Sequence, residues 1–202
     1  MLLLPRPHHI PRLLPRITLR FTSTTPKSYY DLFPRTLPNG PPPSGPFTID
    51  LPSLRREFFA LQQLAHPDVS HQTPNTSPTV PSSAYINTAY RTLLDPLTRA
   101  QHILHLRGID VAGDEGITAD GGEEDGGLLM EVLEAREEVE GAEGKDEVEE
   151  VWRRNEDRIG GCVRRLGEML EGGDLQAARR EVVRLRYWRN VREALEEKGA
   201  GH

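Results

Sequence analysis

FTIDLPSLRREFFALQQLAHPD, residues 47–68, has the pattern of a single amphipathic helix with a signal at each end. Arg55 and Arg56 lie off its apolar face and are expected to point to solvent. Turn-forming residues at 50–53 mark the start. Pro67 marks the end, because the residue before a proline is pushed out of the α region. The apolar residues recur at helical spacing on one face: Leu54, Phe58, Leu61 and Ala65.

A second helical pattern, SAYINTAYRTLLDPLTRAQHILHLRGI at residues 83–109, follows a polar loop that is rich in proline. Asp95 and Pro96 are expected to break or kink it, and Gly108 is expected to end it. Two helices with apolar faces and a polar connection predict an antiparallel hairpin. Ahead of the hairpin, LPNGPPPSGP at 37–46 can only be a loop.

Three further amphipathic patterns fill the carboxyl-terminal part of the chain. The first, LLMEVLEAREEVE at 128–140, is followed by Gly141 and Gly144, which interrupt an acidic run. The second has one apolar stripe: Val148, Val151, Trp152, Ile159, Cys162, Val163, Leu166, Met169 and Leu170. The third runs to Gly199 and directs these residues inward: Leu175, Ala178, Val182, Leu185, Trp188 and Leu195. Such helices bury each other as a three-helix bundle. No β pattern competes, so the predicted fold class is all-α.

Charge and cysteine content exclude several classes of protein. The formal net charge of −6 comes from residues 114–150, which hold 16 acidic and two basic side chains. Residues 111–127, which overlap the start of this stretch, are also rich in glycine and are predicted to be a linker. With a pI of about 5.7 and no basic stripe among aromatics, nucleic-acid binding is not expected. A single cysteine, Cys162, excludes an intramolecular disulfide and a cysteine-based zinc or iron–sulfur centre.

The first 27 residues differ from the rest of the chain. They carry four arginines and one lysine, no acidic residue, and a hydroxyl-rich end. This composition is typical of a mitochondrial transit peptide, and the alternative is a disordered basic tail. Several prolines would interrupt the amphipathic helix of an ordinary transit peptide. We expect residues 1–27 to be a transit peptide and the mature protein to lie in the mitochondrial matrix, with no membrane span.

His66, Pro67 and Asp68 form the most specific short motif, and it has three interpretations. They can simply end a helix. They can supply metal ligands, since His66, Asp68 and His71 have side chains that suit zinc or iron. They can also form a docking element for another protein. The metal site would lack rigid support in a proline-containing loop. His102 and His105, one helical turn apart, fit the face of a helix better than a ligand pair.

The order of motifs resembles one family in particular. The stretches SYYDLF, FTIDLPSLRREFFALQQLAHPD, INTAYRTLLDPLTRAQHILHLRGID and LLMEVLEAREEVE occur in the order found in the HscB family of J-type co-chaperones of iron–sulfur cluster biogenesis. The resemblance covers about residues 28–198. It implies a J-domain at 28–110, the linker, and a scaffold-binding bundle at 128–198. His-Pro-Asp alone indicates only a J-domain, whereas the later motifs are specific to this family.

The resemblance implies one docking site for each of two partners. The first would engage the ATPase of a mitochondrial DnaK-type chaperone: His66, Pro67, Asp68, Arg55 and Arg56. The second would bind the iron–sulfur cluster scaffold protein: Leu129, Met130, Leu133, Glu134, Glu137 and Tyr187. Leu129 and Leu133 are one helical turn apart, so burial in the core is the alternative for them. Val69 stands where the family commonly has lysine, so the expected chaperone-binding surface carries one positive charge fewer.

The implied function is non-enzymatic. The chain would stimulate ATP hydrolysis by the chaperone, deliver the scaffold to it, and hold no cofactor or metal of its own. A general J-domain adaptor with another client and a metal-dependent enzyme using His66, Asp68 and His71 are the alternatives. Binding of a basic partner or a cation by the acidic segment 114–150 competes with the simpler interpretation of a solvated charged face.

Overall fold

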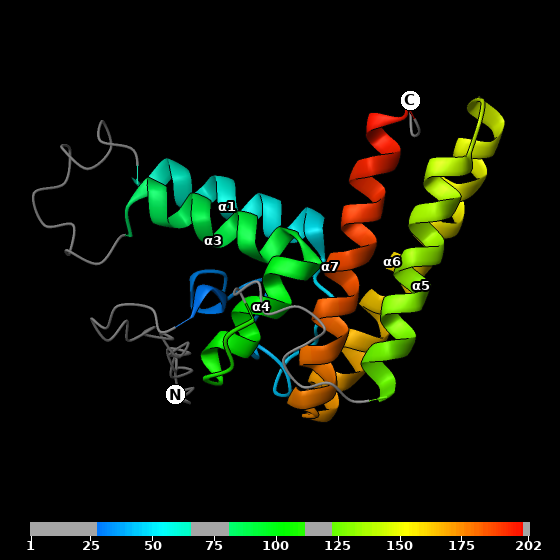
Figure 1. Ribbon diagram of the computed structural model, residues 1–202. Coiled ribbons are helices and arrows are strands. Elements are labelled where there is room, and N and C mark those ends of the chain that lie inside the picture. Colours follow the sequence, from blue (N-terminus) through cyan, green and yellow to red (C-terminus); the bar gives the residue numbers. More distant parts are fainter. Residues whose placement is uncertain (1–27, 66–80, 112–122, 200–202) are drawn as a thin grey trace, which may run out of the picture.

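The structure is a computed structural model that describes residues 28–65, 81–111 and 123–199. These residues form helices and connecting turns, without a strand, which confirms the all-α prediction. Figure 1 shows an amino-terminal group of helices packed against a carboxyl-terminal bundle. The helices are η1 (Tyr29–Leu32), α1 (Leu51–Ala65), α3 (Ser83–Leu94), α4 (Pro96–Leu106), α5 (Glu123–Gly141), α6 (Lys145–Gly172) and α7 (Leu175–Glu197).

Helices α1 and α3 lie side by side as the predicted hairpin and project away from the bundle (Figure 1). Leu54 of α1 is fully buried, and the Phe58 ring stacks on Tyr90 of α3 with centroids 4.2 Å apart. Towards the open end, the Gln62 amide donates to the Ser83 carbonyl. The two helices are therefore joined mainly by a narrow apolar seam.

The Asp95–Pro96 pair breaks the second helical pattern in two, as the sequence predicts. Asp95 is the N-cap of α4, and its carboxylate accepts a hydrogen bond from the Thr98 amide. Pro96 occupies the first turn of α4, where its missing N–H is tolerated. The chain therefore turns at this point, and α4 leaves at an angle from the end of α3 that lies next to α7 (Figure 1).

Arg99 ties the hairpin to the loop before it. Its side chain is buried, and its guanidinium donates to the carbonyl oxygens of Leu93, Leu94 and Phe47 at 2.7–3.2 Å. Phe47 belongs to the proline-rich loop, and its ring also packs on Gly167 of α6. A Cβ at position 167 would come within 3.3 Å of that ring, so glycine allows the loop to approach the helix closely.

The carboxyl-terminal bundle is centred on the long pair α6 and α7. Every residue of the predicted inward set is buried or half-buried, and Trp188 is only 2% exposed, as expected of a core residue. Asn155 of α6 is fully buried and donates its amide to the Trp188 carbonyl oxygen. At the turn between the helices, Gly173 adopts a left-handed conformation and Asp174 caps α7.

Helix α5 begins earlier than the sequence predicts. The expected linker extends to residue 127, whereas α5 starts at Glu123 and contains the glycines at 126 and 127. Each glycine inside a helix is about 1 kcal/mol less favourable than alanine, and packing of the following turns can offset this cost. Leu128 and Val132, in those turns, are buried against the bundle. At its other end α5 stops at Gly141, in agreement with the predicted interruption.

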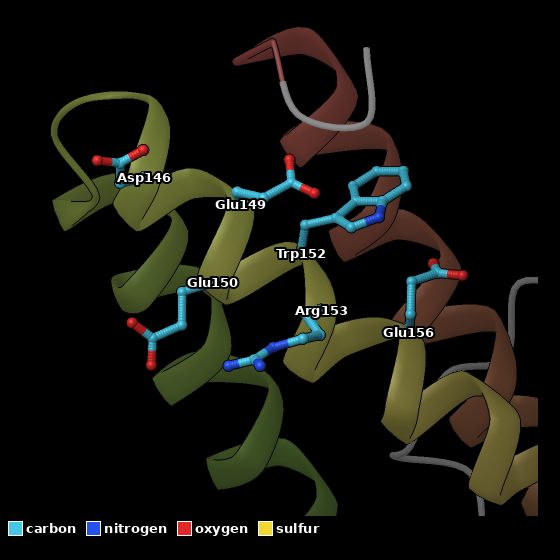
Figure 2. Close-up of a pocket in the computed structure, with 6 residues that line it drawn as sticks. All are labelled: Asp146, Glu149, Glu150, Trp152, Arg153 and Glu156. Atoms are coloured by element: carbon cyan, nitrogen blue, oxygen red, sulfur yellow. The ribbon is translucent and has the colours of Figure 1, made fainter.

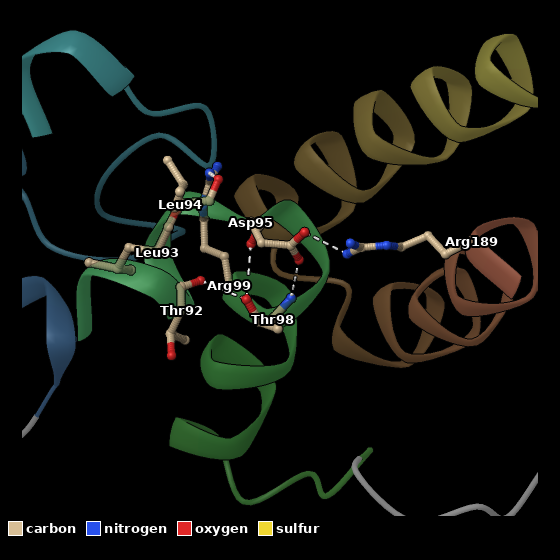
Figure 3. Close-up of polar contacts among 7 residues, drawn as sticks. All are labelled: Thr92, Leu93, Leu94, Asp95, Thr98, Arg99 and Arg189. Atoms are coloured by element: carbon tan, nitrogen blue, oxygen red, sulfur yellow. Dashed lines mark hydrogen bonds and ion pairs between the residues drawn. The ribbon is translucent and has the colours of Figure 1, made fainter. Parts of the chain in front are cut away.

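The two groups of helices meet where α4 packs on α7 and α6. Arg189 of α7 forms an ion pair with the Asp95 carboxylate at 2.5 Å, so one side chain both caps α4 and contacts the bundle (Figure 3). Beside it, Arg186 of α7 donates to the carbonyl oxygen of Val111. The hairpin is thus attached to the bundle near its root, and in the described part of the chain α1 makes no contact with α5, α6 or α7.

Candidate functional site

The outer face of α1 carries the basic residues expected there. Arg55 and Arg56 are both exposed, opposite the Leu54 side of the helix. Glu57 lies between them and the core, and its carboxylate accepts hydrogen bonds from the backbone amides of Arg35 and Thr36 at 3.0 and 2.9 Å. The exposed face is therefore basic, with its acidic neighbour engaged by the preceding loop.

The motif that follows α1 falls outside the described residues. His66, Pro67 and Asp68 come directly after Ala65, the last residue of α1, and Val69 and His71 lie in the same undescribed segment. The 1–27 segment is likewise outside the description. The docking motif and the transit peptide both stay predictions from sequence.

Helix α5 has two apolar faces on opposite sides. One is buried against the bundle: Leu128, Val132, Ala135 and Val139. The other consists of exposed residues: Leu129 (45%), Met130 (57%) and Leu133 (44%). Because successive helix positions are about 100° apart, the centres of these two sets lie about 140° from each other around the helix. Leu129 and Leu133 are therefore surface residues, and the core alternative for them is excluded.

The acidic candidates share the exposed side of α5. Glu134 and Glu137 are exposed and follow Met130 and Leu133 at helical spacing, which places them beside the apolar residues. We call the set Leu129, Met130, Leu133, Glu134 and Glu137 the α5 patch. It has an apolar centre with a charged border, the composition of a transient protein interface.

Tyr187 sits on α7, which packs against α5. Its side chain is half-buried at the edge of the core, whereas its neighbour Trp188 is fully inside. The phenol is therefore partly accessible from the bundle surface. The structure places Tyr187 on a helix adjoining the α5 patch and gives no direct contact between its ring and the patch leucines.

His102 and Cys162, the other histidine and cysteine side chains considered above, are packed among their neighbours and have structural roles. His102 stacks on Tyr29 at 4.3 Å, and its Nε2 accepts a hydrogen bond from the Tyr29 amide at 3.3 Å. Burial, and then His105, lower its pKa. Burial, and then Glu181, raise the pKa of Cys162 to about 12, which keeps it a thiol. Among the described residues, no group of His, Cys, Asp and Glu is arranged to hold a metal ion.

An acidic hollow on α6 does not form a convergent site. Figure 2 shows that its carboxylates spread along the helix and do not point at a common centre. Trp152 forms one wall, with the Arg192 guanidinium 5.3 Å from its ring. This arrangement fits the solvated charged face considered above. The residues that line it are Asp146, Glu149, Glu150, Trp152, Arg153 and Glu156.

Sequence reasoning missed two features of these surfaces. The stripe of Leu128, Val132, Ala135 and Val139 on α5 is visible in their helical spacing, although spacing alone does not tell that this stripe is the buried one. Phe59 is half-exposed on α1, and its position outside the Leu54 stripe was a sufficient signal. The helices of the described part are also too short or too polar to span a membrane.

Comparison with known proteins agrees with this arrangement. A family model described as the HSCB C-terminal oligomerisation domain matches residues 124–196, from the start of α5 almost to the end of α7. The mitochondrial J-type co-chaperone JAC1 of Saccharomyces cerevisiae is 35% identical over 183 residues, 90% of this chain and 92% of that protein. The chain belongs to the HscB family of J-type co-chaperones.

A solved structure of the yeast protein and one further relative extend the family likeness. A solved structure of the Jac1 co-chaperone from Saccharomyces cerevisiae has a TM-score of 0.69 and 32% identity, covering 91% of this chain and 98% of that one. The iron–sulfur cluster co-chaperone protein HscB of Mus musculus is 28% identical over 151 residues, 74% of this chain and 62% of that protein. In this HscB fold, α1, α3 and α4 belong to the J-domain, and α5, α6 and α7 form the carboxyl-terminal bundle.

Proposed function

We propose that this chain is a non-enzymatic co-chaperone of iron–sulfur cluster assembly in the mitochondrial matrix. It stimulates ATP hydrolysis by a DnaK-type chaperone and delivers the iron–sulfur cluster scaffold protein to it. The observation that carries the proposal is the presence of two exposed faces on separate helices. The basic face lies on the J-domain and the apolar α5 patch on the bundle.

The chaperone site has the chemistry of a docking element. Asp68 offers a carboxylate that can pair with a partner arginine in a charge-assisted contact. His66 supplies an imidazole donor or acceptor, and Pro67 restricts the backbone between them. Arg55 and Arg56, exposed on the helix that leads into this motif, meet acidic side chains of the chaperone. No covalent step falls to this chain.

The scaffold site is the α5 patch completed by Tyr187. Three large apolar side chains on one exposed face would be costly without a partner, and monomeric proteins seldom keep such patches unless they bind something. Glu134 and Glu137 at the border favour a partner surface with basic residues around an apolar recess. The patch is small, which suits a transient complex from which the scaffold protein is released to the chaperone.

The first test measures steady-state ATP hydrolysis by the mitochondrial DnaK-type chaperone, with and without scaffold protein. His66→Gln is expected to abolish stimulation in both conditions. The double variant Leu129→Ala/Leu133→Ala is expected to lose only the scaffold-dependent part. Leu106→Ala removes an exposed leucine on α4 (36% exposed) and serves as the matched control that behaves as wild type.

The outcomes separate the alternatives. Absence of stimulation by the wild-type chain would overturn the co-chaperone proposal. Normal stimulation with no scaffold dependence would leave a J-domain adaptor with a different client. A stoichiometric metal ion in the purified chain that is lost in His66→Gln and Asp68→Asn would favour the metal-dependent alternative.

A further inference from the structure

Phe59 is an aromatic side chain on the outside of the J-domain. It is 50% exposed, although phenylalanine side chains are usually buried. The Arg55 guanidinium lies 5.6 Å from the centre of its ring, and the Phe58 ring lies 5.4 Å away. Phe58 in turn stacks on Tyr90 of α3. The exposed ring is thus supported from beneath by the core and flanked by a cation.

This support matters for binding. An aromatic ring with two rotatable bonds, already packed against neighbours, loses little conformational freedom when a partner covers it. Aromatic and arginine side chains are also the residue types that most often dominate the free energy of protein interfaces. Phe59 with Arg55 therefore has the composition of an interface centre.

Phe59 lies in the second half of α1, the helix that the His-Pro-Asp motif follows in the sequence. Phe59 precedes Ala65 by six residues, a rise of about 9 Å along the helix. Arg56 and Gln63, at positions i−3 and i+4 from Phe59, share its side of α1 and are exposed. The surface is therefore continuous from the two arginines, across Phe59, to the end of α1.

The charge on this face points to the nature of the partner. Two arginines are exposed, and the carboxylate of Glu57, the acidic residue of α1, is engaged by the backbone amides at 35 and 36. A complementary surface is acidic with an apolar recess. Two cations are few for an association driven by charge alone, and each exposed pair contributes about 1 kcal/mol or less.

We propose that Phe59 is the apolar anchor of the chaperone-binding face. Its ring enters an apolar recess on the DnaK-type chaperone, and Arg55 and Arg56 pair with carboxylates at the border of that recess. This inference rests on the proposed function and names the contact that supplies most of the affinity at the same site. Burial of the Phe59 ring, and not the ion pairs of the two arginines, then supplies most of the binding free energy.

The experiment measures the concentration of the full chain that gives half-maximal stimulation of the chaperone ATPase. Phe59→Ala is expected to raise this concentration about tenfold or more, as loss of an interface anchor does. Phe59→Lys adds a positive charge at the same position and is expected to weaken stimulation to a similar degree. Leu106→Ala is the matched control, with an exposed leucine removed from α4. All three should keep the wild-type melting temperature, because the altered side chains are exposed.

A second measurement examines salt. Raising the ionic strength weakens contacts between exposed charges. On a logarithmic scale, the half-maximal concentrations of Phe59→Ala and of the wild type are expected to rise in parallel with salt, because both proteins keep the same charged contacts.

Each outcome has a definite meaning. If the wild type stimulates and His66→Gln does not, but Phe59→Ala matches the wild type, the inference is wrong while the proposed function stands. If Phe59→Lys stimulates better than wild type, the face is purely basic and the inference is also wrong. If Phe59→Ala impairs scaffold binding or self-association and leaves the ATPase response intact, the ring has another occupant. A wild type without stimulation overturns the proposed function and this inference together.

Discussion

The J-domain hairpin and the long pair of the bundle are both antiparallel helix pairs, yet they use their apolar residues differently. Helix α1 fully buries only Leu54, while α6 buries eight residues and α7 seven. Conversely, α1 leaves Phe59 and Leu64 50% and 58% exposed. The bundle pair is stabilised by its own core, whereas the hairpin carries apolar side chains on the outside, where a partner can cover them.

The polar contacts of the α1–α3 hairpin and of the α6–α7 pair differ in the same way. Between α6 and α7, Arg165 pairs with the buried Glu181 at 2.7 Å and Arg192 pairs with Glu156 at 3.1 Å. The hairpin has polar contacts with the rest of the protein at its root, through Arg99 and Asp95, and through Glu57, which accepts from the loop amides at 35 and 36. The docking surface of α1 therefore sits on the less tightly held end of the molecule.

Amide hydrogen exchange should show the largest difference between the two pairs. Amides near the middle of α6, around Cys162 and Leu166, are expected to exchange about 100-fold or more slowly than those at 62–65 in α1, because buried contacts set the free energy of local opening. The measurement is exchange followed by mass spectrometry on the free chain. Equal protection in the two segments would contradict the comparison. Addition of the chaperone should protect 62–65 and leave α6 unchanged.

Arg99→Met should weaken the root of the hairpin. The change leaves the buried carbonyl oxygens of Leu93 and Phe47 without their donor, and each such loss costs about 1–3 kcal/mol. We expect the free energy of unfolding in urea to fall by about 3 kcal/mol. Arg91→Met removes an exposed arginine from α3 and should change it by less than about 0.5 kcal/mol. Similar values for the two variants would show that Arg99 does not hold the loop.

Much of this fold was accessible from spacing alone. The Leu54 stripe, the break at Asp95–Pro96 and the buried Trp188 all follow from local rules that depend on residues close in sequence. The contacts of Arg99 could not be predicted in this way, because its carbonyl acceptors include Phe47, 52 positions earlier. Such contacts depend on how the loop and helices pack in three dimensions.

The two apolar faces of α5 illustrate a second limit. An apolar stripe at helical spacing usually indicates burial, and the sequence contains two such stripes on one helix. Residue pattern does not tell which of them meets the bundle. Packing against α6 and α7 decides it, burying Val132 and exposing Leu133. The α5 patch could be proposed from sequence only through the family resemblance, and its exposure is a property of the tertiary structure.

The Asp95–Arg189 pair should have a moderate effect on the attachment of hairpin to bundle. Arg189→Ala removes an ion pair whose side chains are both about one-third exposed, which contributes about 0.5 kcal/mol. Asp95→Ala loses this pair and also the cap of α4, so it should cost about 1–2 kcal/mol. Urea unfolding of the two single variants and the double variant gives the interaction free energy between Asp95 and Arg189. If Asp95→Ala costs the same in the wild-type and Arg189→Ala backgrounds, the two side chains do not interact in solution.

The smallest expected effect is a pH dependence at His102, where η1 is attached to α4. The ring is half-buried and neutral, with Nε2 accepting from the Tyr29 amide, and burial lowers its pKa below 6.5. The unfolded chain therefore takes up a proton more readily than the folded chain does. The stabilisation from this contact is complete above the unfolded pKa and is lost as the pH falls towards the folded value. Between pH 7.5 and 5.5, the wild type should lose more unfolding free energy than His102→Gln, in which the other histidines are unchanged and cancel. Parallel pH profiles for the two proteins would show that His102 is equally protonated in the folded and unfolded states.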